Sequence, residues 1–309
     1  MSMKKNLVLV LSILLVLLLL AGCQRETYTD ISASPKTEPY KHPETLISPE
    51  ELNPLLKKPN VTIIDTRPLR EYLQGHIPSA ICFPTANFLR HPQIPGKLID
   101  PVPLGIHLRR AGVNNTDHII VYSDNYSHAG LWFYLNNFTR QVQILNGGLT
   151  KWQAEGYPVN TGQERKPYVG DIHLTGDKLV KPLEDIFTAP PYVRDIAVKK
   201  EGIIIDARPA EEYLGEVGPP GMRGHILGAI NVTWDQLVNE DFTFKTAPEL
   251  RKFFQAKGVA PDQQIIVYSN TPLESSFVYF VLDKLLGYPD VKFFDAWYYY
   301  RVAEFPHAR

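Results

Sequence analysis

Continuous apolar runs alternate with helix-like stretches along most of the chain. In its first half, runs rich in β-branched residues predict strands at 61–64, 80–83, 119–122 and 142–145. Helices are predicted at 104–111 and 129–138, and Ser48-Pro49-Glu50-Glu51 predicts the start of another. Because apolar and polar residues do not alternate within the strands, both faces of the sheet should be covered. The pattern therefore predicts an α/β fold, in which a mostly parallel sheet is flanked by helices.

The second half repeats the order of motifs in the first. The segment from Leu108 to Ser123 aligns without a gap on the segment from Phe254 to Ser269. Further motifs recur in the same order, namely Ile63-Ile64-Asp65-Thr66-Arg67-Pro68 with Ile204-Ile205-Asp206-Ala207-Arg208-Pro209, Glu71-Tyr72 with Glu212-Tyr213, and Gly75-His76-Ile77 with Gly224-His225-Ile226. The repeating unit is too long for a solenoid. The sequence therefore predicts two copies of one domain, at residues 46–160 and 161–309.

The N-terminal segment is typical of a secretory signal peptide. Lys4 and Lys5 precede an apolar run at 7–21, which is shorter than the about 20 residues that a membrane-spanning helix needs. Leu20-Ala21-Gly22-Cys23 resembles the lipobox of bacterial lipoproteins, which implies removal of residues 1–22 and acylation of Cys23. An uncleaved membrane anchor is the alternative interpretation.

The segment that follows Cys23 is polar and rich in proline. Residues 23–45 have no apolar period and contain Pro35, Pro39 and Pro43, so they predict an extended, flexible tether. A lipid anchor on Cys23 would hold the protein at a membrane of the cell envelope. We therefore expect an extracytoplasmic protein, either periplasmic or at the outer cell surface.

The charge balance argues against a nucleic-acid partner. The 309 residues contain 32 Lys and Arg against 33 Asp and Glu, and no dense basic block occurs. Cys23 and Cys82 are the two cysteines, too few for a disulfide framework or a cysteine-rich metal site. No cluster of His, Asp or Glu has the spacing of a zinc or calcium site. We expect neither a metal nor an organic cofactor.

Both copies resemble rhodanese domains. The shared motifs are Asp-x-Arg, Glu-Tyr, Gly-His-Ile and Ile-Val-Tyr, and the first copy adds Gly147-Gly148-Leu149 with Trp152. The resemblance implies an α/β domain that moves sulfane sulfur, typically from thiosulfate to a thiol, through a persulfide on one cysteine. It further implies that this cysteine follows the tyrosine of a strand and heads a six-residue loop whose backbone amides hold the anion.

In this sequence the position after each strand tyrosine is a serine. Ser123 stands there in the first copy and Ser269 in the second. A thiol with a pKa of about 8.5 can be ionised by loop amides and can store sulfur in an S–S bond, which a hydroxyl cannot do. We therefore expect that neither loop transfers sulfur by the family mechanism.

The remaining loop residues also differ from what an anion site needs. The first loop continues with Asp124, Asn125, Tyr126, Ser127 and His128, and the second with Asn270, Thr271, Pro272, Leu273 and Glu274. Asp124 and Glu274 add negative charge, and Pro272 removes a backbone donor. The first loop keeps all its N–H groups, so we expect it to be the better binding candidate.

Three other sets of residues could carry chemistry. Ser123, Asp124 and His128 contain the residue types of a hydrolase triad, although residues so close in sequence seldom align as one. Asp65 with Arg67, and Asp206 with Arg208, are expected to be ion pairs that hold the turn after a strand. His76 and His225 lie in turn sequences and are expected to bond backbone carbonyls rather than a metal.

Cys82 is the remaining thiol if Cys23 is acylated. It lies in an apolar strand, where a cysteine usually behaves as a buried hydrophobic residue. A reactive role would require it to be exposed at the strand's end, near the Ser123 loop.

Two functions follow from these features. The first is a membrane-tethered rhodanese-like protein without sulfurtransferase turnover, which binds a small anion, a sulfur compound or a protein partner. The alternative is a thiosulfate:thiol sulfurtransferase of low activity that uses Cys82 or a thiol from a partner.

Overall fold

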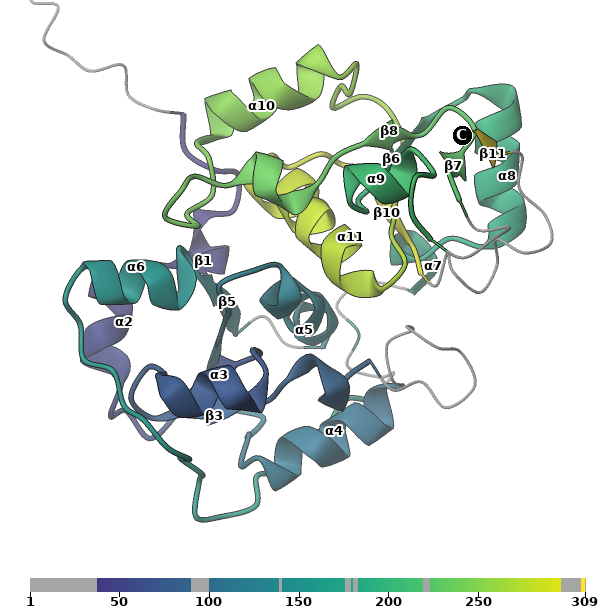
Figure 1. Cartoon of the computed structure of the whole chain (residues 1–309). Coiled ribbons are helices and arrows are strands. Elements are labelled where there is room, and N and C mark those ends of the chain that lie inside the picture. Colours follow the sequence, from purple (N-terminus) through teal and green to yellow (C-terminus); the bar gives the residue numbers. More distant parts are fainter. Residues whose placement is uncertain are drawn as a thin grey trace, which may run out of the picture. The chain divides into compact units, whose positions relative to one another are not determined.

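A parallel β-sheet lies at the centre of each half of the chain (Figure 1). The computed structural model describes residues 38–89, 100–138, 141–175, 179, 183–218, 223–295 and 307–308. The predicted signal peptide, Cys23 and the tether up to residue 37 lie outside these residues. Within the described part, no helix is both long enough and apolar enough to cross a membrane.

The first sheet has the strand order β1-β5-β4-β2-β3, and its neighbouring strands are parallel. Its strands are β1 (Leu46–Ile47), β2 (Val61–Asp65), β3 (Ala80–Cys82), β4 (His118–Tyr122) and β5 (Val142–Leu145). The predicted strands are confirmed to within one residue at each end, and β1 was not predicted. In this register Asp65 lies between Cys82 and Tyr122 at the carboxyl ends of three strands.

Helices cover both faces of this sheet. They are α2 (Pro49–Leu52), α3 (Leu69–Gln74), α4 (Pro101–Arg110), α5 (Ser127–Asn136) and α6 (Gly148–Ala154). Ser48 caps α2 as predicted, since its hydroxyl accepts the Glu51 amide and the Glu51 carboxylate accepts the Ser48 amide. Nearly every residue of α5 is buried, which explains why its sequence is apolar on all sides.

The second sheet repeats the strand order of the first. Its order is β10-β9-β6-β8, which matches β5-β4-β2-β3, and it is also parallel. The strands of this half are β6 (Ile203–Asp206), β7 (His225–Ile226), β8 (Ile230–Asn231), β9 (Ile265–Tyr268), β10 (Val291–Phe294) and β11 (His307–Ala308), the last paired with β7. Its helices are α7 (Leu183–Ile186), α8 (Pro190–Lys199), α9 (Ala210–Tyr213), α10 (Ala247–Ala256) and α11 (Pro272–Phe280). The predicted duplication of an α/β domain is thus confirmed.

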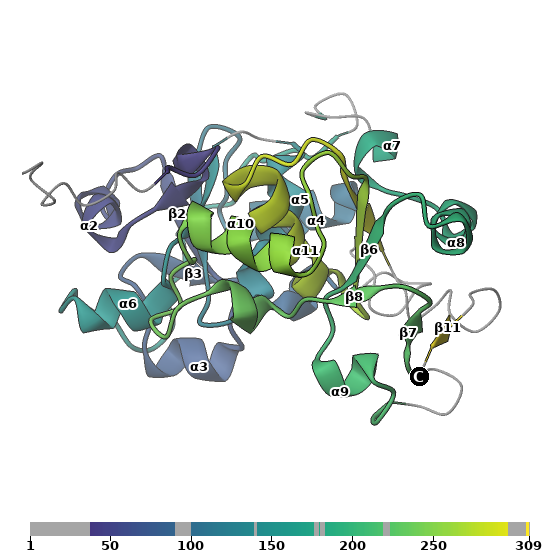
Figure 2. The same cartoon turned by 90° about the horizontal axis from the view of Figure 1, so that it is seen from above.

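One hydrophobic core extends through both halves of the unit from Glu38 onward. Helices α5 and α11 lie between the two sheets in both Figure 1 and Figure 2, and they pack directly against each other. Trp132 of α5 meets Phe280 edge to face at 4.6 Å between ring centroids, and Phe133 stacks on Phe293 at 4.7 Å. This packing brings together the two serine loops, because each loop directly precedes one of these helices.

Two segments near the predicted domain borders are held by tertiary contacts. Residues 38–45, predicted as part of a flexible tether, contact both halves: the Tyr40 hydroxyl lies within hydrogen-bonding distance of the Phe244 and Lys245 carbonyls, and the Glu44 carbonyl accepts the Gln143 side chain. After the first domain, the segment 163–174 returns along the first half, and the amides of Gly170 and Ile172 donate to carbonyls there. Proline content alone did not reveal that residues 38–45 have hydrogen-bonding partners.

Candidate functional site

Ser123 and Ser269 lie at corresponding places in the two domains. Ser123 directly follows β4 and Ser269 directly follows β9, at the carboxyl ends of central strands where α/β proteins bind ligands. Both serines are nearly inaccessible, with 2% and 1% of their surface exposed. The fold therefore places both residues where the sequence predicts chemistry, but it buries them.

The Ser123 hydroxyl is the centre of a hydrogen-bonded loop. The O–H group donates to the Asn125 carbonyl at 2.9 Å, and its oxygen lies 2.7 Å from Nδ1 of His128 and accepts the His128 amide at 3.3 Å. The Ser127 amide donates to Oδ1 of Asn125 at 2.7 Å. We expect this loop to be the better binding candidate because it keeps all its N–H groups. In the structure, the side chains of Asn125 and Ser123 accept the amides of Ser127 and His128, so these two donors are not available to a ligand.

His128 is enclosed beside this hydroxyl. Burial lowers the pKa of its imidazole to about 3, a shift that the Asn125 carbonyl opposes in part, so the ring is neutral at physiological pH. Its Nε2 has no hydrogen-bonding partner among the described residues. The cavity next to the loop has a volume of about 10 Å³, so it holds at most one water molecule. An anion the size of thiosulfate does not fit into this space.

Asp124 is directed away from His128. Its Oδ1 accepts the Thr150 amide at 2.9 Å, and its Oδ2 lies 3.3 Å from Nη1 of Arg67. The carboxylate therefore does not orient the imidazole as the acid of a triad does. Ser123 and His128 form a close pair, but no acid among the described residues completes a hydrolase triad with them.

The Ser269 loop is also closed by its own side chains. The Ser269 hydroxyl accepts the Ser275 amide at 3.1 Å, lies 2.7 Å from the Ser275 hydroxyl, and donates to the Thr271 carbonyl. The Thr271 hydroxyl donates to Glu274 at 2.9 Å. Burial raises the pKa of the Glu274 carboxyl, and the nearby charge of Glu212 raises it further. A carboxylate at this position opposes anion binding, as the sequence predicts.

The two loops cover each other across the domain border. Tyr126 of the first loop is hydrogen-bonded to Glu274 of the second, and its ring lies 5.7 Å from that of Trp234. His128 contacts the edge of Phe277 at 5.8 Å between centroids. Sequence reasoning missed Trp234 and Phe277, because no local motif shows which aromatic side chains of one domain will reach the other.

The paired acids and arginines support the loops structurally, as predicted. Arg67 binds Asp65 at 2.6 Å between Nη2 and Oδ2, and the same nitrogen donates to the Gly75 carbonyl at 2.6 Å. In the second domain, Arg208 forms the corresponding ion pair with Asp206, and its Nη2 donates to the Gly224 carbonyl at 2.7 Å. All four charged side chains are buried. Each arginine thus joins the end of a strand to the glycine of the next turn.

The two turn histidines also bond backbone carbonyls, as predicted. Nδ1 of His76 lies 2.9 Å from the Tyr72 carbonyl, and Nδ1 of His225 lies 2.8 Å from the Tyr213 carbonyl. Each imidazole stacks on the tyrosine that it bonds. In the part of the chain that the structure describes, no group of three or more His, Cys, Asp or Glu is placed to hold a metal ion.

Cys82 differs from a fully buried core cysteine. It is the last residue of β3, an edge strand of the described sheet, and its side chain is partly exposed. Burial raises the pKa of its thiol to about 11, and the charge of Asp65 contributes to the rise. Strand β2 lies between β3 and β4. Cys82 is therefore about 10 Å, or two strand spacings, from β4, the strand that Ser123 follows. It is therefore not part of the serine loop.

Comparison with known proteins agrees with this architecture. The family described as "Rhodanese-like domain" matches residues 48–155 and 190–297. The sulfur carrier protein TtuD of Thermus thermophilus is 31% identical over 277 residues, which cover 83% of this chain and 93% of that protein. The 3-mercaptopyruvate sulfurtransferase of Escherichia coli is 34% identical over 258 residues, which cover 77% of this chain and 88% of that protein.

A solved structure supports the same assignment. The crystal structure of SseA from Escherichia coli, described as a 3-mercaptopyruvate sulfotransferase with the rhodanese fold, superposes with a TM-score of 0.72 at 31% identity. The match covers 81% of this chain and 97% of that one. Tandem parallel sheets, duplicated motifs and these relatives lead to one conclusion: the chain belongs to the rhodanese-like sulfurtransferase family and carries two rhodanese-like domains.

Proposed function

We propose that this protein is a membrane-tethered, extracytoplasmic member of the family that binds its ligand or partner without turning over sulfur. The proposal rests on the hydrogen bonding of the two serines and on the small open volume beside Ser123. At each nucleophile position implied by the family resemblance, a serine hydroxyl is bonded into its own loop, and beside Ser123 only about 10 Å³ is open.

The chemistry of the hydroxyl supports this proposal. Sulfur transfer needs a nucleophile that ionises near neutral pH, attacks a sulfur atom and carries it as a persulfide. Ser123 has a neutral imidazole beside it, which could accept a proton, but no oxygen counterpart of the persulfide is a stable carrier. Ser269 is paired with another hydroxyl instead of a base.

The alternative, transfer through Cys82, is opposed by the state of its thiol. With a pKa of about 11, roughly one Cys82 side chain in ten thousand is ionised at pH 7. The thiol also lies two strand spacings from the Ser123 loop, because β2 lies between β3 and β4. We therefore propose that Cys82 is not a sulfur carrier.

The membrane attachment rests on the sequence of residues 1–23. We propose that Cys23 is acylated after removal of residues 1–22, which places the protein in the cell envelope. Metabolic labelling with a radioactive fatty acid tests this directly. Wild-type protein should incorporate the label and fractionate with membranes, whereas Cys23→Ser should do neither. Equal labelling of the two proteins would contradict the proposal.

Sulfur transfer is tested on the full chain in detergent, with thiosulfate or 3-mercaptopyruvate as donor and cyanide as acceptor. The Escherichia coli 3-mercaptopyruvate sulfurtransferase serves as the active control. We expect no turnover above the uncatalysed rate for wild type and none for Ser123→Cys, because the loop has no room for the donor. Wild-type turnover that disappears in Cys82→Ser would overturn the proposal in favour of the alternative. Turnover by Ser123→Cys would show that the loop is accessible and would overturn the argument from its closure.

A further inference from the structure

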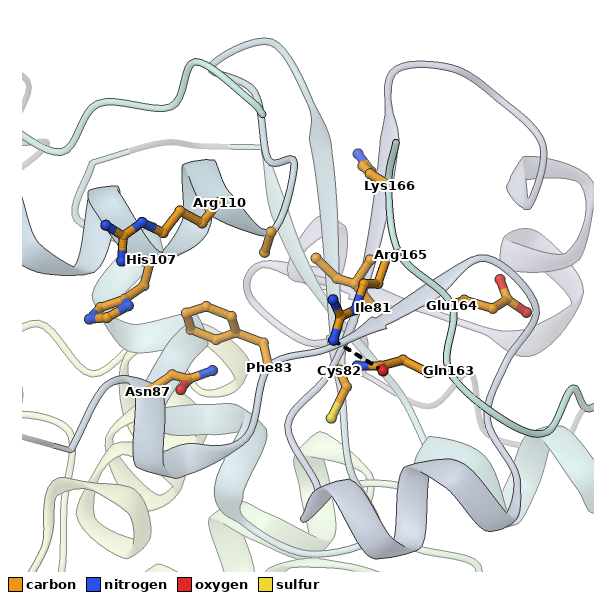
Figure 3. Close-up of a pocket in the computed structure, with 11 residues that line it drawn as sticks. Ile81, Cys82, Phe83, Asn87, His107, Arg110, Gln163, Glu164, Arg165 and Lys166 are labelled. Atoms are coloured by element: carbon orange, nitrogen blue, oxygen red, sulfur yellow. Dashed lines mark hydrogen bonds between the residues drawn. The ribbon is translucent and has the colours of Figure 1, made fainter. Parts of the chain in front are cut away.

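A second cavity, of about 310 Å³, lies at the edge of the first sheet and shares no lining residue with the cavity beside Ser123. Its volume is in the range of small-molecule sites, roughly 300–1,000 Å³. The floor is formed by Ile81, Cys82 and Phe83, at the end of β3. One wall is the last turn of α4, and the other is the segment 163–166 (Figure 3). The cavity is therefore built by three separate parts of the first domain.

Both walls carry basic side chains. His107 and Arg110 come from α4, and Arg165 comes from the opposite segment. Figure 3 shows His107 and Arg110 on one side of the Phe83 ring and Arg165 on the other. Arg165 donates to the Gln163 side chain at 3.1 Å, and among the described residues most of its five N–H donors have no further partner. Positive charge thus lies at two places, separated by an aromatic ring.

Arg110 and Arg165 form no ion pair with a described residue of the cavity lining. Glu164 is the acidic residue in the lining, and its carboxylate accepts the Ser79 amide at 2.9 Å and the Asn160 side chain at 2.6 Å. Among the described residues, neither arginine has a carboxylate within ion-pairing distance. The carboxylate of Glu164 is thus held by other donors and forms no ion pair with either arginine, and the basic side chains of the lining outnumber this one acidic group.

Lys166 has a different role from the two arginines. Its ammonium group lies 3.1 Å from the Asp117 carboxylate and also contacts the Thr62 hydroxyl, so it fixes the segment 163–166 to the sheet. A neighbouring cavity of about 300 Å³ shares Ile81, Glu164, Arg165 and Lys166, and adds Lys57 and Lys58. These lysines increase the positive potential around the opening and would attract an anion toward it.

We propose that this cavity binds a small organic dianion, with one carboxylate at Arg110 and His107, a second at Arg165, and an apolar carbon chain over Phe83 and Ile81. Arginine binds carboxylates through paired N–H donors, and Asn87 and Gln163 supply further polar contacts. The apolar floor between the two cations distinguishes this ligand class from a compact inorganic oxyanion. The cavity shares no lining residue with the cavity beside Ser123, and Cys82, the thiol of the alternative function, lies in its floor.

The test measures binding of adipate to the full chain in detergent by isothermal titration calorimetry. Binding should weaken as the salt concentration rises. Arg110→Gln and Arg165→Gln should each reduce the affinity by about 10- to 100-fold, the usual effect of removing a hydrogen bond to a charged group. Arg70→Gln is the matched control, because Arg70 is an exposed arginine of α3 outside the cavity, and it should leave the affinity unchanged.

Two further probes test the spacing of the charges. Hexanoate, which has one carboxylate, and thiosulfate, which is compact, should each bind at least about tenfold more weakly than adipate. Equal binding of thiosulfate would overturn the two-ended site, and so would adipate binding that survives both arginine substitutions. Absence of adipate binding to wild type would also overturn it, and thermal unfolding shows whether each variant is folded. The variants leave Ser123, Ser269 and Cys82 intact, so the sulfur-transfer assay on the same proteins tests the proposed function separately from adipate binding.

Discussion

The Ser123 hydroxyl lies 2.7 Å from Nδ1 of His128, and both side chains are buried beneath the second domain. In another setting such a pair would indicate an activated nucleophile. Here Asp124 is held by Thr150 and Arg67, and aromatic side chains including Trp234 and Phe277 line the small cavity. The pair therefore stabilises the loop, and this gives a first prediction.

Acid should destabilise the folded protein through His128. The folded pKa is about 3, whereas an unfolded histidine has a pKa of about 6.5, so below pH 6.5 the unfolded chain binds a proton that the folded chain does not. The free energy of unfolding is therefore unaffected by this group above pH 6.5. Between pH 6.5 and pH 3 it falls by roughly 1.4 kcal/mol for each pH unit of acidification. Urea unfolding from pH 7 to pH 4 should show this slope, and it should be smaller in His128→Gln. Identical slopes in the two proteins would contradict the prediction.

Glu274 should make the folded protein less stable as the pH rises, whereas His128 makes it less stable as the pH falls. Because burial raises its pKa, the folded chain keeps this proton at a pH where the unfolded chain has lost it. Its contribution to stability therefore decreases as the pH rises above about 4.5. Glu274→Gln cannot ionise but still offers an acceptor to Thr271, so it should be more stable than wild type at pH 8 and no more stable at pH 4. A variant less stable at pH 8 would show that the charged carboxylate is favourable.

Gly130 should be required for the contact between the two domains. A Cβ there would lie 2.5 Å from Cδ2 of Leu273 and 3.3 Å from Phe88. Gly130→Ala should therefore destabilise the protein by about 1–3 kcal/mol, although alanine favours a helix. Gly105→Ala in α4 is the matched control, because its Cβ would meet neighbours at 3.5 Å or more. The control should gain up to about 1 kcal/mol of stability in thermal or urea unfolding. Equal effects at the two sites would rule out the close packing of α5 on α11.

Cys82 should react slowly with alkylating reagents. In the full chain carrying Cys23→Ser it is the single thiol. At pH 8, a pKa of about 11 predicts alkylation roughly two hundred times slower than that of an ordinary cysteine with a pKa near 8.5. Iodoacetamide labelling followed by mass spectrometry measures this rate, and the urea-unfolded chain provides the reference. Similar rates in both states would mean that the thiol is ionised more readily than its surroundings imply.

Features that depend on a few neighbouring residues could be predicted from the sequence. The strand at 142–145 has the predicted bounds, and Ser48 caps a helix as expected. The pairing of Asp65 with Arg67 was also predictable, because the two charges lie two positions apart at the end of a strand. Local propensity and short hydrogen bonds determine these features.

Features that depend on distant residues could not be predicted in this way. An apolar run does not show that β3 lies at a sheet edge, so the partial exposure of Cys82 was not evident. The first loop keeps all its N–H groups in the sequence, but only the folded loop shows that Ser123 and Asn125 accept some of these donors. The cavity between Arg110 and Arg165 likewise joins residues far apart in the chain.

The continuous core has a consequence for how the chain unfolds. Duplicated domains often melt separately, but here α5 and α11 bury each other's apolar surfaces between the sheets. A fragment that ended after the first domain would expose α5, which is apolar on every side, to water. The two copies should therefore behave as one cooperative unit, with a single melting transition, and a truncated half should aggregate instead of remaining monomeric.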